Sequence, residues 1–134
     1  MADCIFCKIV KGEIPSHKVY EDDDFIGFLD IRPLTKGNAL IVPKKHYQWT
    51  YDVPDFGQYF EVAKKVGLAA QKTFDAEWIC FMTLGLEIFH AHIRVIPRYK
   101  NDKHSEVVNL DRIEEYSEAE MEDIAKQIRG NIDK

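Results

Sequence analysis

The sequence predicts an α+β fold, a five-stranded and mostly antiparallel sheet with helices against one face, and three observations favour it. Short segments rich in β-branched and aromatic residues follow one another between turns, as the strands of such a sheet do. One longer segment repeats apolar residues at spacings of three and four, the period of an amphipathic helix. The chain of 134 residues is 46% hydrophobic, so residues 1–134 are expected to form a single domain with a buried core.

Three predicted strands occupy the N-terminal third of the chain. Residues 16–20 and 25–31 carry strand-like side chains and are separated by the acidic turn 21–24, an arrangement typical of an antiparallel pair. Residues 38–42 form the third predicted strand, which Pro43 closes.

A long central helix is predicted from Pro54 onward. Its apolar positions share one helical face, and its lysines lie largely outside that face. The apolar positions are Tyr59, Ala63, Val66, Ala70 and Phe74, and the lysines are Lys64, Lys65 and Lys72. Residues 78–84 and 90–96 are then the fourth and fifth predicted strands.

The chain ends in a second predicted helix, over about residues 117–130. Ser117 and Glu120 have the spacing of a capping box, in which each side chain bonds the backbone N–H of the other residue. An apolar stripe follows at Met121, Ile124, Ala125 and Ile128. No repeat, low-complexity segment or linker divides the chain.

Charge and composition restrict the classes of partner. The 18 Lys and Arg against 23 Asp and Glu give a net charge of −5, which argues against binding a nucleic-acid polymer and makes any phosphate recognition local. No apolar run approaches the roughly 20 residues that span a bilayer, and no secretory signal is evident, so a soluble cytoplasmic protein without membrane contact is expected. The three cysteines indicate metal binding or reduced thiols rather than a disulfide framework.

Polar and apolar residues alternate in the stretch from His90 to Val95. Alternate side chains of a strand point to the same face, so His90, His92 and Arg94 are expected to line one surface. Two imidazoles and a guanidinium suit phosphate chemistry, because His supplies a neutral nitrogen nucleophile near pH 7 and Arg a permanent charge for phosphate oxygens. The alternative is a polar strand face covered by solvent.

The stretch from Gly85 to Arg98 resembles the signature of the histidine-triad (HIT) nucleotide-binding family, in which His, apolar, His, apolar, His precedes an aliphatic pair and often Pro-Arg. Five further segments resemble that family in its usual order: residues 4–10, 13–16, 20–23, 28–33 and 41–46. The resemblance covers roughly residues 3–100 and indicates the zinc-bearing bacterial-type branch, with Arg94 at the third triad position. It implies a HIT-like fold and a homodimer whose two sheets join edge to edge.

Cys4 and Cys7 have the short spacing of a zinc knuckle, but two thiolates leave a tetrahedral ion half coordinated. His46 and His90 complete a Cys2His2 set, and the resemblance implies that zinc-bearing members use the matching positions. A site closed by four protein ligands would be structural and would pin the N-terminal segment to the sheet. The alternatives are two buried thiols beside ordinary histidines, and a redox pair, which the absence of a strand before Cys4 disfavours.

His92 then remains without a metal to hold. The resemblance implies that this middle histidine attacks the α-phosphorus of a nucleotide derivative, expels an amine, phosphate or nucleotide, and forms a nucleotidyl-histidine that water later hydrolyses. Arg98 and backbone amides near the row are expected to help hold the phosphate oxygens. The alternatives for His92 are phosphate contact without chemistry and a purely structural role.

The resemblance also implies a nucleoside pocket. Its apolar walls, which suit a purine base, are Ile5, Phe6 and Ile9 on one side and Phe28 and Ile31 on the other. Asp30 matches the acidic residue that accepts both ribose hydroxyls, and Asn38 falls at a position near the phosphates. Core packing is the alternative for the apolar residues, and a strand-ending turn is the alternative for Asp30.

Departures from the family pattern bear on catalysis. Arg94 replaces the third histidine, Leu86 stands where Gln is usual, and the turn before the strand is shortened to residues 82–85. Arg94 can hold a phosphate, yet it cannot readily give a proton to a leaving group as a histidinium can. Glu87 stands where a small hydroxyl residue is common and adds a negative charge beside the phosphate site. Turnover is therefore expected to be slow or limited to good leaving groups.

Two functions follow from these residues. The first is a nucleotide-binding hydrolase or transferase of histidine-triad type, acting on purine nucleoside phosphoramidates or related phosphoanhydrides and dinucleotides through a nucleotidyl-histidine. The second is a nucleotide-binding regulatory protein that keeps the zinc-stapled fold and the pocket, with weak or no catalysis because of Arg94 and Leu86. The presence of His92 favours the enzyme.

Overall fold

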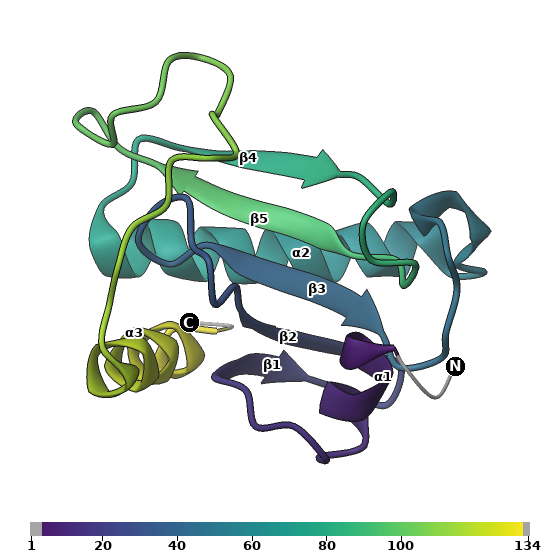
Figure 1. The fold of residues 1–134 in the computed structure, drawn as a ribbon. Coiled ribbons are helices and arrows are strands. Elements are labelled where there is room, and N and C mark those ends of the chain that lie inside the picture. The colour runs from purple at the N-terminus through teal and green to yellow at the C-terminus, as the bar shows by residue number, and fades with distance from the viewer. Residues whose placement is uncertain (1–3, 133–134) are drawn as a thin grey trace.

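A five-stranded antiparallel sheet with the strand order β1-β2-β3-β5-β4 forms the centre of the molecule (Figure 1). The structure is a computed structural model that describes residues 4–132, so the predicted start of the resemblance at residue 3 lies outside it. The elements in chain order are α1 (Ile5–Val10), β1 (Lys18–Glu21), β2 (Phe25–Leu29), β3 (Ala39–Pro43), a 3-10 turn (Thr50–Asp52), α2 (Phe56–Phe74), β4 (Trp78–Thr83), β5 (Ile93–Arg98) and α3 (Glu118–Gly130). The predicted α+β class is confirmed.

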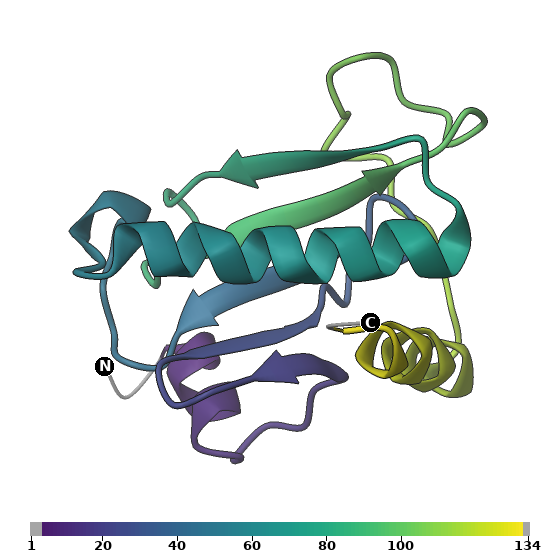
Figure 2. The same cartoon turned by 180° about the vertical axis from the view of Figure 1, so that it is seen from behind.

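The two long helices cover one face of the sheet, and the short helix α1 lies against the other face (Figures 1 and 2). Helix α2 crosses behind β3 and β5 in Figure 1 and also contacts β4, whereas α3 packs beside β1, β2 and α2. The sequence predicted helices on one face only. The second face is therefore the side on which a site formed by α1 and the sheet can lie.

Strands β2 and β3 are buried on both faces because each face has its own apolar cluster. Side chains that point to α2 and α3 belong to the main core, among them Phe25, Leu29, Ala39, Ile41, Ile93 and Val95. Side chains that point to α1 form a smaller core of Phe6, Ile9, Ile26, Phe28, Leu40 and Val42. The two-residue alternation of a strand thus separates a structural core from the face that α1 covers.

Strand β5 begins at Ile93, three residues later than predicted. The residues before it lie outside the backbone ladder between β3 and β5 and bond other groups instead. The Ala91 N–H donates to the Tyr47 carbonyl, and His90 Nε2 donates to the carbonyl of Pro43. His90 and His92 therefore precede the strand, although Ala91 still packs in the main core with Ile93 as the predicted alternation requires.

Helix α1 was not predicted because its 6 residues are too few to show a helical period. Cys4 caps it, since the Cys4 Sγ accepts a hydrogen bond from the Cys7 N–H at 3.4 Å. The predicted β2 ended two residues too late. The Asp30 side chain accepts a hydrogen bond from the Arg32 N–H at 2.9 Å and turns the chain away from the sheet.

The predictions for both long helices are confirmed. In α2 the predicted face is buried, with only Phe74 partly exposed, and the helix ends at Asp75 in the left-handed conformation with φ 58°. Ser117 and Glu120 form the capping box at the start of α3. Among residues 4–132 there is no helix that combines the length and the apolarity needed to cross a membrane.

Candidate functional site

A cavity of about 310 Å³ lies on the α1 face of the sheet. Its lining is mainly apolar and comes from the N-terminal segment, from the end of β2 and the turn after it, from β3 and β5, and from two loops. The lining residues are Ile5, Phe6, Ile9, Ile14, Pro15, Ser16, Phe28 to Arg32, Leu34, Leu40, Glu87, Ile88, His92, Arg94 and Leu110. The polar groups in this set are few and distinct, as in a small-molecule site.

His92 lies in this cavity with only 4% of its surface exposed. Its Nδ1–H donates a hydrogen bond to the His90 carbonyl at 2.8 Å, which leaves Nε2 with a free lone pair. Burial lowers the pKa of His92, and the positive charge of Arg94 lowers it further. The ring is therefore a neutral imidazole with one nitrogen fixed and the other available as a nucleophile.

Arg94 is the cation beside this imidazole. It stands on β5 level with Leu40, and both side chains line the cavity. Its Nε is buried and has no hydrogen-bond partner within residues 4–132. A buried donor without an acceptor costs free energy, so an anion in the cavity would stabilise this guanidinium.

Asp30 supplies an acidic group in the turn after β2. Burial raises the pKa of its carboxyl, while the hydrogen bond from the Arg32 N–H and the charge of Arg94 act in the opposite direction. That hydrogen bond engages only Oδ1. The carboxylate has further lone pairs to accept hydrogen bonds from neighbouring hydroxyl groups.

Aromatic rings form the apolar part of the cavity. Phe6 and Phe28 meet edge to face with centroids 5.6 Å apart, and Phe6 also meets the His92 ring at 5.3 Å. Ile5 and Ile9 extend the wall along α1, and the strongly exposed Ile31 lies at the opening. The structure thus brings the five apolar residues predicted for the base pocket to the same cavity as His92.

A cluster of two thiols and two imidazoles lies at the N-terminal end of α1. The ligand atoms of Cys4, Cys7, His46 and His90 all lie within 4.8 Å of one another. His90 Nδ1 is 3.3 Å from the Cys4 Sγ and 3.5 Å from the Cys7 Sγ, and His46 Nδ1 is 3.3 Å from the Cys7 Sγ. Tetrahedral zinc with these ligand types separates sulfur from nitrogen by about 3.6 Å, so the four residues fit such an ion.

Neighbouring groups orient the ligands of this cluster. His90 Nε2 donates to the Pro43 carbonyl at 2.8 Å, which turns Nδ1 toward the thiols. Burial lowers the pKa of His90 to about 4, so the ring is in the neutral form that binds metals. Burial also raises the pKa of Cys7, and the neighbouring Cys4 adds to this effect. A bound cation would reverse that shift, because it stabilises the thiolates.

Comparison with known proteins agrees with this geometry. The HIT domain model matches residues 11–101, which is more than half of the chain. The chain belongs to the HIT family. An uncharacterized HIT-like protein of Borreliella burgdorferi is 40% identical over 135 residues and covers 91% of this chain and 96% of that protein.

Two further HIT relatives have names that state an activity. The adenosine 5'-monophosphoramidase of Saccharomyces cerevisiae is 38% identical, covering 72% of this chain and 63% of that protein. The adenylylsulfatase of Arabidopsis thaliana is 38% identical, covering 75% of this chain and 54% of that protein. A zinc-bound histidine triad family protein from Mycobacterium smegmatis has a similar structure, with a TM-score of 0.79, 30% identity, and coverage of 98% of this chain and 94% of that chain.

Two residues predicted to hold phosphate do not reach the cavity in this HIT protein. Asn38 is fully buried elsewhere. Its Oδ1 accepts from the Leu34 N–H at 2.9 Å, and its Nδ2 donates to the Val95 carbonyl at 3.1 Å. The amide thereby joins β3 to β5 and to the turn before β3.

Arg98 is also used within the fold. Its Nε donates to Asp102 Oδ2 at 2.8 Å, and its other nitrogens donate to the carbonyls of Ser105 and Glu106. Arg98 and Asp102 are 4% and 5% exposed. Arg98 is absent from the lining of the cavity, and its guanidinium organises the loop after β5.

Several lining residues were missed by the sequence reasoning. Leu110 reaches the cavity from the long segment between β5 and α3, and Ile88 comes from the loop before His90. Neither position belongs to a periodic pattern in the sequence. Glu87 was noted in the sequence, but only the structure places it in the lining. Leu86, the position of the usual Gln, is 80% exposed and does not line the cavity.

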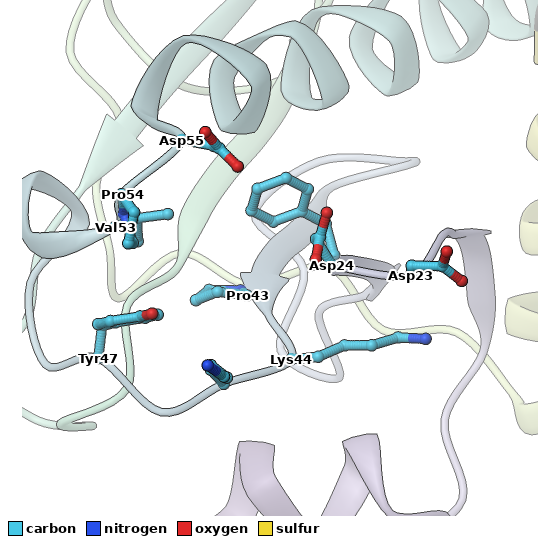
Figure 3. A pocket seen from close by; sticks show the side chains of 10 residues that line it. Asp23, Asp24, Pro43, Lys44, Tyr47, Val53, Pro54 and Asp55 are labelled. Carbon is cyan, nitrogen blue, oxygen red and sulfur yellow. The ribbon is translucent and has the colours of Figure 1, made fainter.

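A separate hollow lies at the opposite end of β2, between the turn before that strand and the start of α2 (Figure 3). It is lined by the carboxylates of Asp23, Asp24 and Asp55 and by Lys44 and Tyr47, among others (Figure 3). Lys44 is already paired with Glu21 at 2.9 Å. None of the predicted site residues lies there, so it is not part of the candidate site.

The buried Arg98 gives a direct stability test. We expect Arg98→Gln to lower the free energy of unfolding by about 3–5 kcal/mol, because Asp102 is left buried without its charge partner. Denaturant unfolding measures this loss, and Arg112→Gln on the exposed loop serves as the control. A variant of normal stability that had lost its affinity for nucleotides would instead make Arg98 a phosphate ligand.

Proposed function

We propose that this HIT protein is a nucleotide-binding hydrolase or transferase that acts on purine nucleoside phosphoramidates or related phosphoanhydrides. The observation that carries the proposal is the orientation of His92. This neutral imidazole has Nδ1 bonded to a backbone carbonyl and presents Nε2 in a cavity that Arg94 also lines, and the buried Nε of Arg94 has no hydrogen-bond partner among residues 4–132. A fixed nucleophile beside a fixed cation suits substitution at phosphorus.

The reaction proceeds in two substitutions. His92 Nε2 forms a bond to the α-phosphorus while the bond from phosphorus to the leaving group breaks, and the leaving group departs with that electron pair. The His90 carbonyl then stabilises the positive charge that the imidazole acquires, through the Nδ1–H bond of 2.8 Å. Water attacks the same phosphorus in the second step, the phosphorus–nitrogen bond to His92 breaks, and a nucleoside monophosphate leaves with His92 again neutral.

The remaining residues of the cavity position the nucleotide. Phe6 and Phe28 offer flat apolar surfaces to a purine base, and Asp30 offers carboxylate oxygens to the ribose hydroxyls. Arg94 binds the phosphate oxygens with charge-assisted hydrogen bonds. These groups support substrate binding without participating in proton transfer.

The Cys4, Cys7, His46 and His90 cluster is proposed as a structural zinc site. Zinc held there would stabilise the thiolates and tie α1 to the sheet. The link matters for the cavity, because α1 carries Cys7 together with the wall residues Ile5, Phe6 and Ile9. His90 also carries the carbonyl that orients His92.

Arg94 limits the range of leaving groups. A guanidinium keeps its proton at physiological pH, so it cannot protonate a departing amine. Substrates whose leaving group needs no proton are therefore favoured, and sulfate in an adenylyl sulfate is of this kind. The name of the Arabidopsis relative states an activity on that class, and the yeast relative is named for a phosphoramidate.

A regulatory nucleotide-binding protein is the second candidate, and the exposed Leu86 favours it. This side chain lies outside the cavity and adds no polar group there.

With either function we expect a homodimer. Strand β4 is an edge of the sheet, and its Trp78 and Phe81 are 42% and 43% exposed.

Metal content tests the zinc proposal. Protein purified without chelator is expected to hold one zinc per chain, and Cys4→Ser with Cys7→Ser is expected to hold none and to unfold at a lower temperature. Elemental analysis and thermal unfolding provide the measurements. Cys80→Ser is the matched control, because Cys80 lies on β4 away from the cluster. Stoichiometric zinc in the double variant would refute this site.

Binding of sugar-modified nucleotides tests Asp30. Removing the carboxylate in Asp30→Ala is expected to weaken ribonucleotide binding by about 1.5–3 kcal/mol, the typical contribution of a hydrogen bond to a charged group. Affinity for the 2',3'-dideoxy analogue is expected to change much less, because it has no hydroxyls to donate. Calorimetric titration gives both constants. Equal losses for the two ligands would assign Asp30 to the turn alone.

Leaving-group dependence tests the roles of His92 and Arg94. We expect Arg94→His to raise turnover of a phosphoramidate with a poor leaving group by up to about 10²–10⁴-fold, because a histidinium can donate the missing proton. A substrate with a good leaving group is expected to gain little. His92→Asn is expected to abolish turnover in both backgrounds and to keep measurable nucleotide binding. Binding without turnover in the parent protein and in Arg94→His would support the regulatory protein.

A further inference from the structure

Glu87 is a carboxylate without a partner in the lining of the cavity. It lies in the loop between β4 and β5, and its side chain is exposed. Across residues 4–132 it forms neither an ion pair nor a side-chain hydrogen bond. Its charge opposes phosphate binding near His92 and Arg94, so a role must come from another part of the substrate.

The strand register gives the cavity two distinct ends. Phe28, Leu40 and Arg94 are level with one another across β2, β3 and β5. Strands β2 and β5 both run antiparallel to β3, and therefore run parallel to each other. Asp30 comes two residues after Phe28, whereas His92 comes two residues before Arg94. The Asp30 and His92 side chains thus lie on opposite sides of the row of three residues that are level across the strands. The loop with Glu87 enters the cavity from the His92 end.

A nucleotide bound as proposed above has its ribose at the Asp30 end and its α-phosphorus between Arg94 and His92. The group attached beyond the phosphorus then lies toward the loop that carries Glu87. The cavity has one other acidic residue in its lining, Asp30, and that residue is at the ribose end. Of the two acidic residues in the lining, Glu87 is therefore the one on the side of the leaving group.

We propose that Glu87 determines specificity among the phosphoramidate substrates, whose turnover Arg94 keeps slow, and favours those in which the amine leaving group carries a second, positively charged ammonium group. This inference rests on the proposed function. Glu87 does not touch the reacting atoms and acts by attraction across the open end of the cavity. Because its side chain is exposed, the preference is expected to be about 2- to 5-fold at low salt and to diminish as salt screens the charge.

Three adenosine phosphoramidates test the proposal, each with the same linker amine and with a terminal ammonium, hydroxyl or carboxylate. The kcat/KM ratio of the ammonium to the hydroxyl substrate is compared between proteins, so that the intrinsic reactivity of each substrate cancels. We expect Glu87→Gln to lower this ratio by about 2- to 5-fold, and Glu87→Lys to favour the carboxylate substrate. Glu61→Gln removes a charge from the exposed side of α2 and is expected to leave the ratio unchanged.

Identical ratios in the parent protein and in Glu87→Gln would overturn the proposal. Turnover of the hydroxyl substrate tests the hydrolase function separately, since that tail carries no charge. Non-hydrolysable methylenephosphonate analogues with the same three tails provide a second readout through their Kd values. If no substrate is turned over, a Glu87-dependent order of these Kd values still supports the charge preference, and equal values refute it.

Discussion

His90 is the residue on which the rest of the site depends, because its side chain and its backbone serve two different groups. Its ring packs against the thiols of Cys4 and Cys7 and donates to the Pro43 carbonyl, which fixes the segment between β4 and β5 against β3. Its own carbonyl accepts the Nδ1–H of His92 and leaves Nε2 free. A movement of His90 would therefore disturb both the proposed metal ligands and the proposed nucleophile.

The charges in the cavity explain how this HIT protein differs from a family member with three histidines. Burial lowers the pKa of the His92 imidazole, and the permanent positive charge of Arg94 beside it adds to this effect, so the ring stays neutral. The same charge attracts a phosphate but supplies no proton to a leaving group. Glu87 adds an opposite charge to the lining of the same cavity. We propose that these residues make the charge and the stability of the leaving group, rather than proton donation to it, the basis of substrate selectivity.

Sequence periodicity predicted the elements that pack through repeated apolar contacts, such as α2 with Tyr59 and the capped helix after Ser117. It could not predict α1, which is held by one cap and by tertiary contacts. The thiol spacing and the resemblance correctly gathered four potential metal ligands. They assigned Asn38 and Arg98 to the phosphates, and both side chains are bonded within the fold, which residue type does not reveal. The contribution of Leu110 depends on the path of a long loop, which leaves no local signal.

Covalent capture of the nucleotide tests whether His92 is the nucleophile. The protein is mixed with an adenosine phosphoramidate, quenched within one turnover under conditions that preserve phosphorus–nitrogen bonds, and digested for mass analysis. The proposed chemistry predicts an adenylyl group on the peptide that contains His92, which forms before free nucleotide appears and is absent from His92→Asn. Product formation without this adduct, or an adduct on another residue, would contradict the assignment of His92 as the nucleophile.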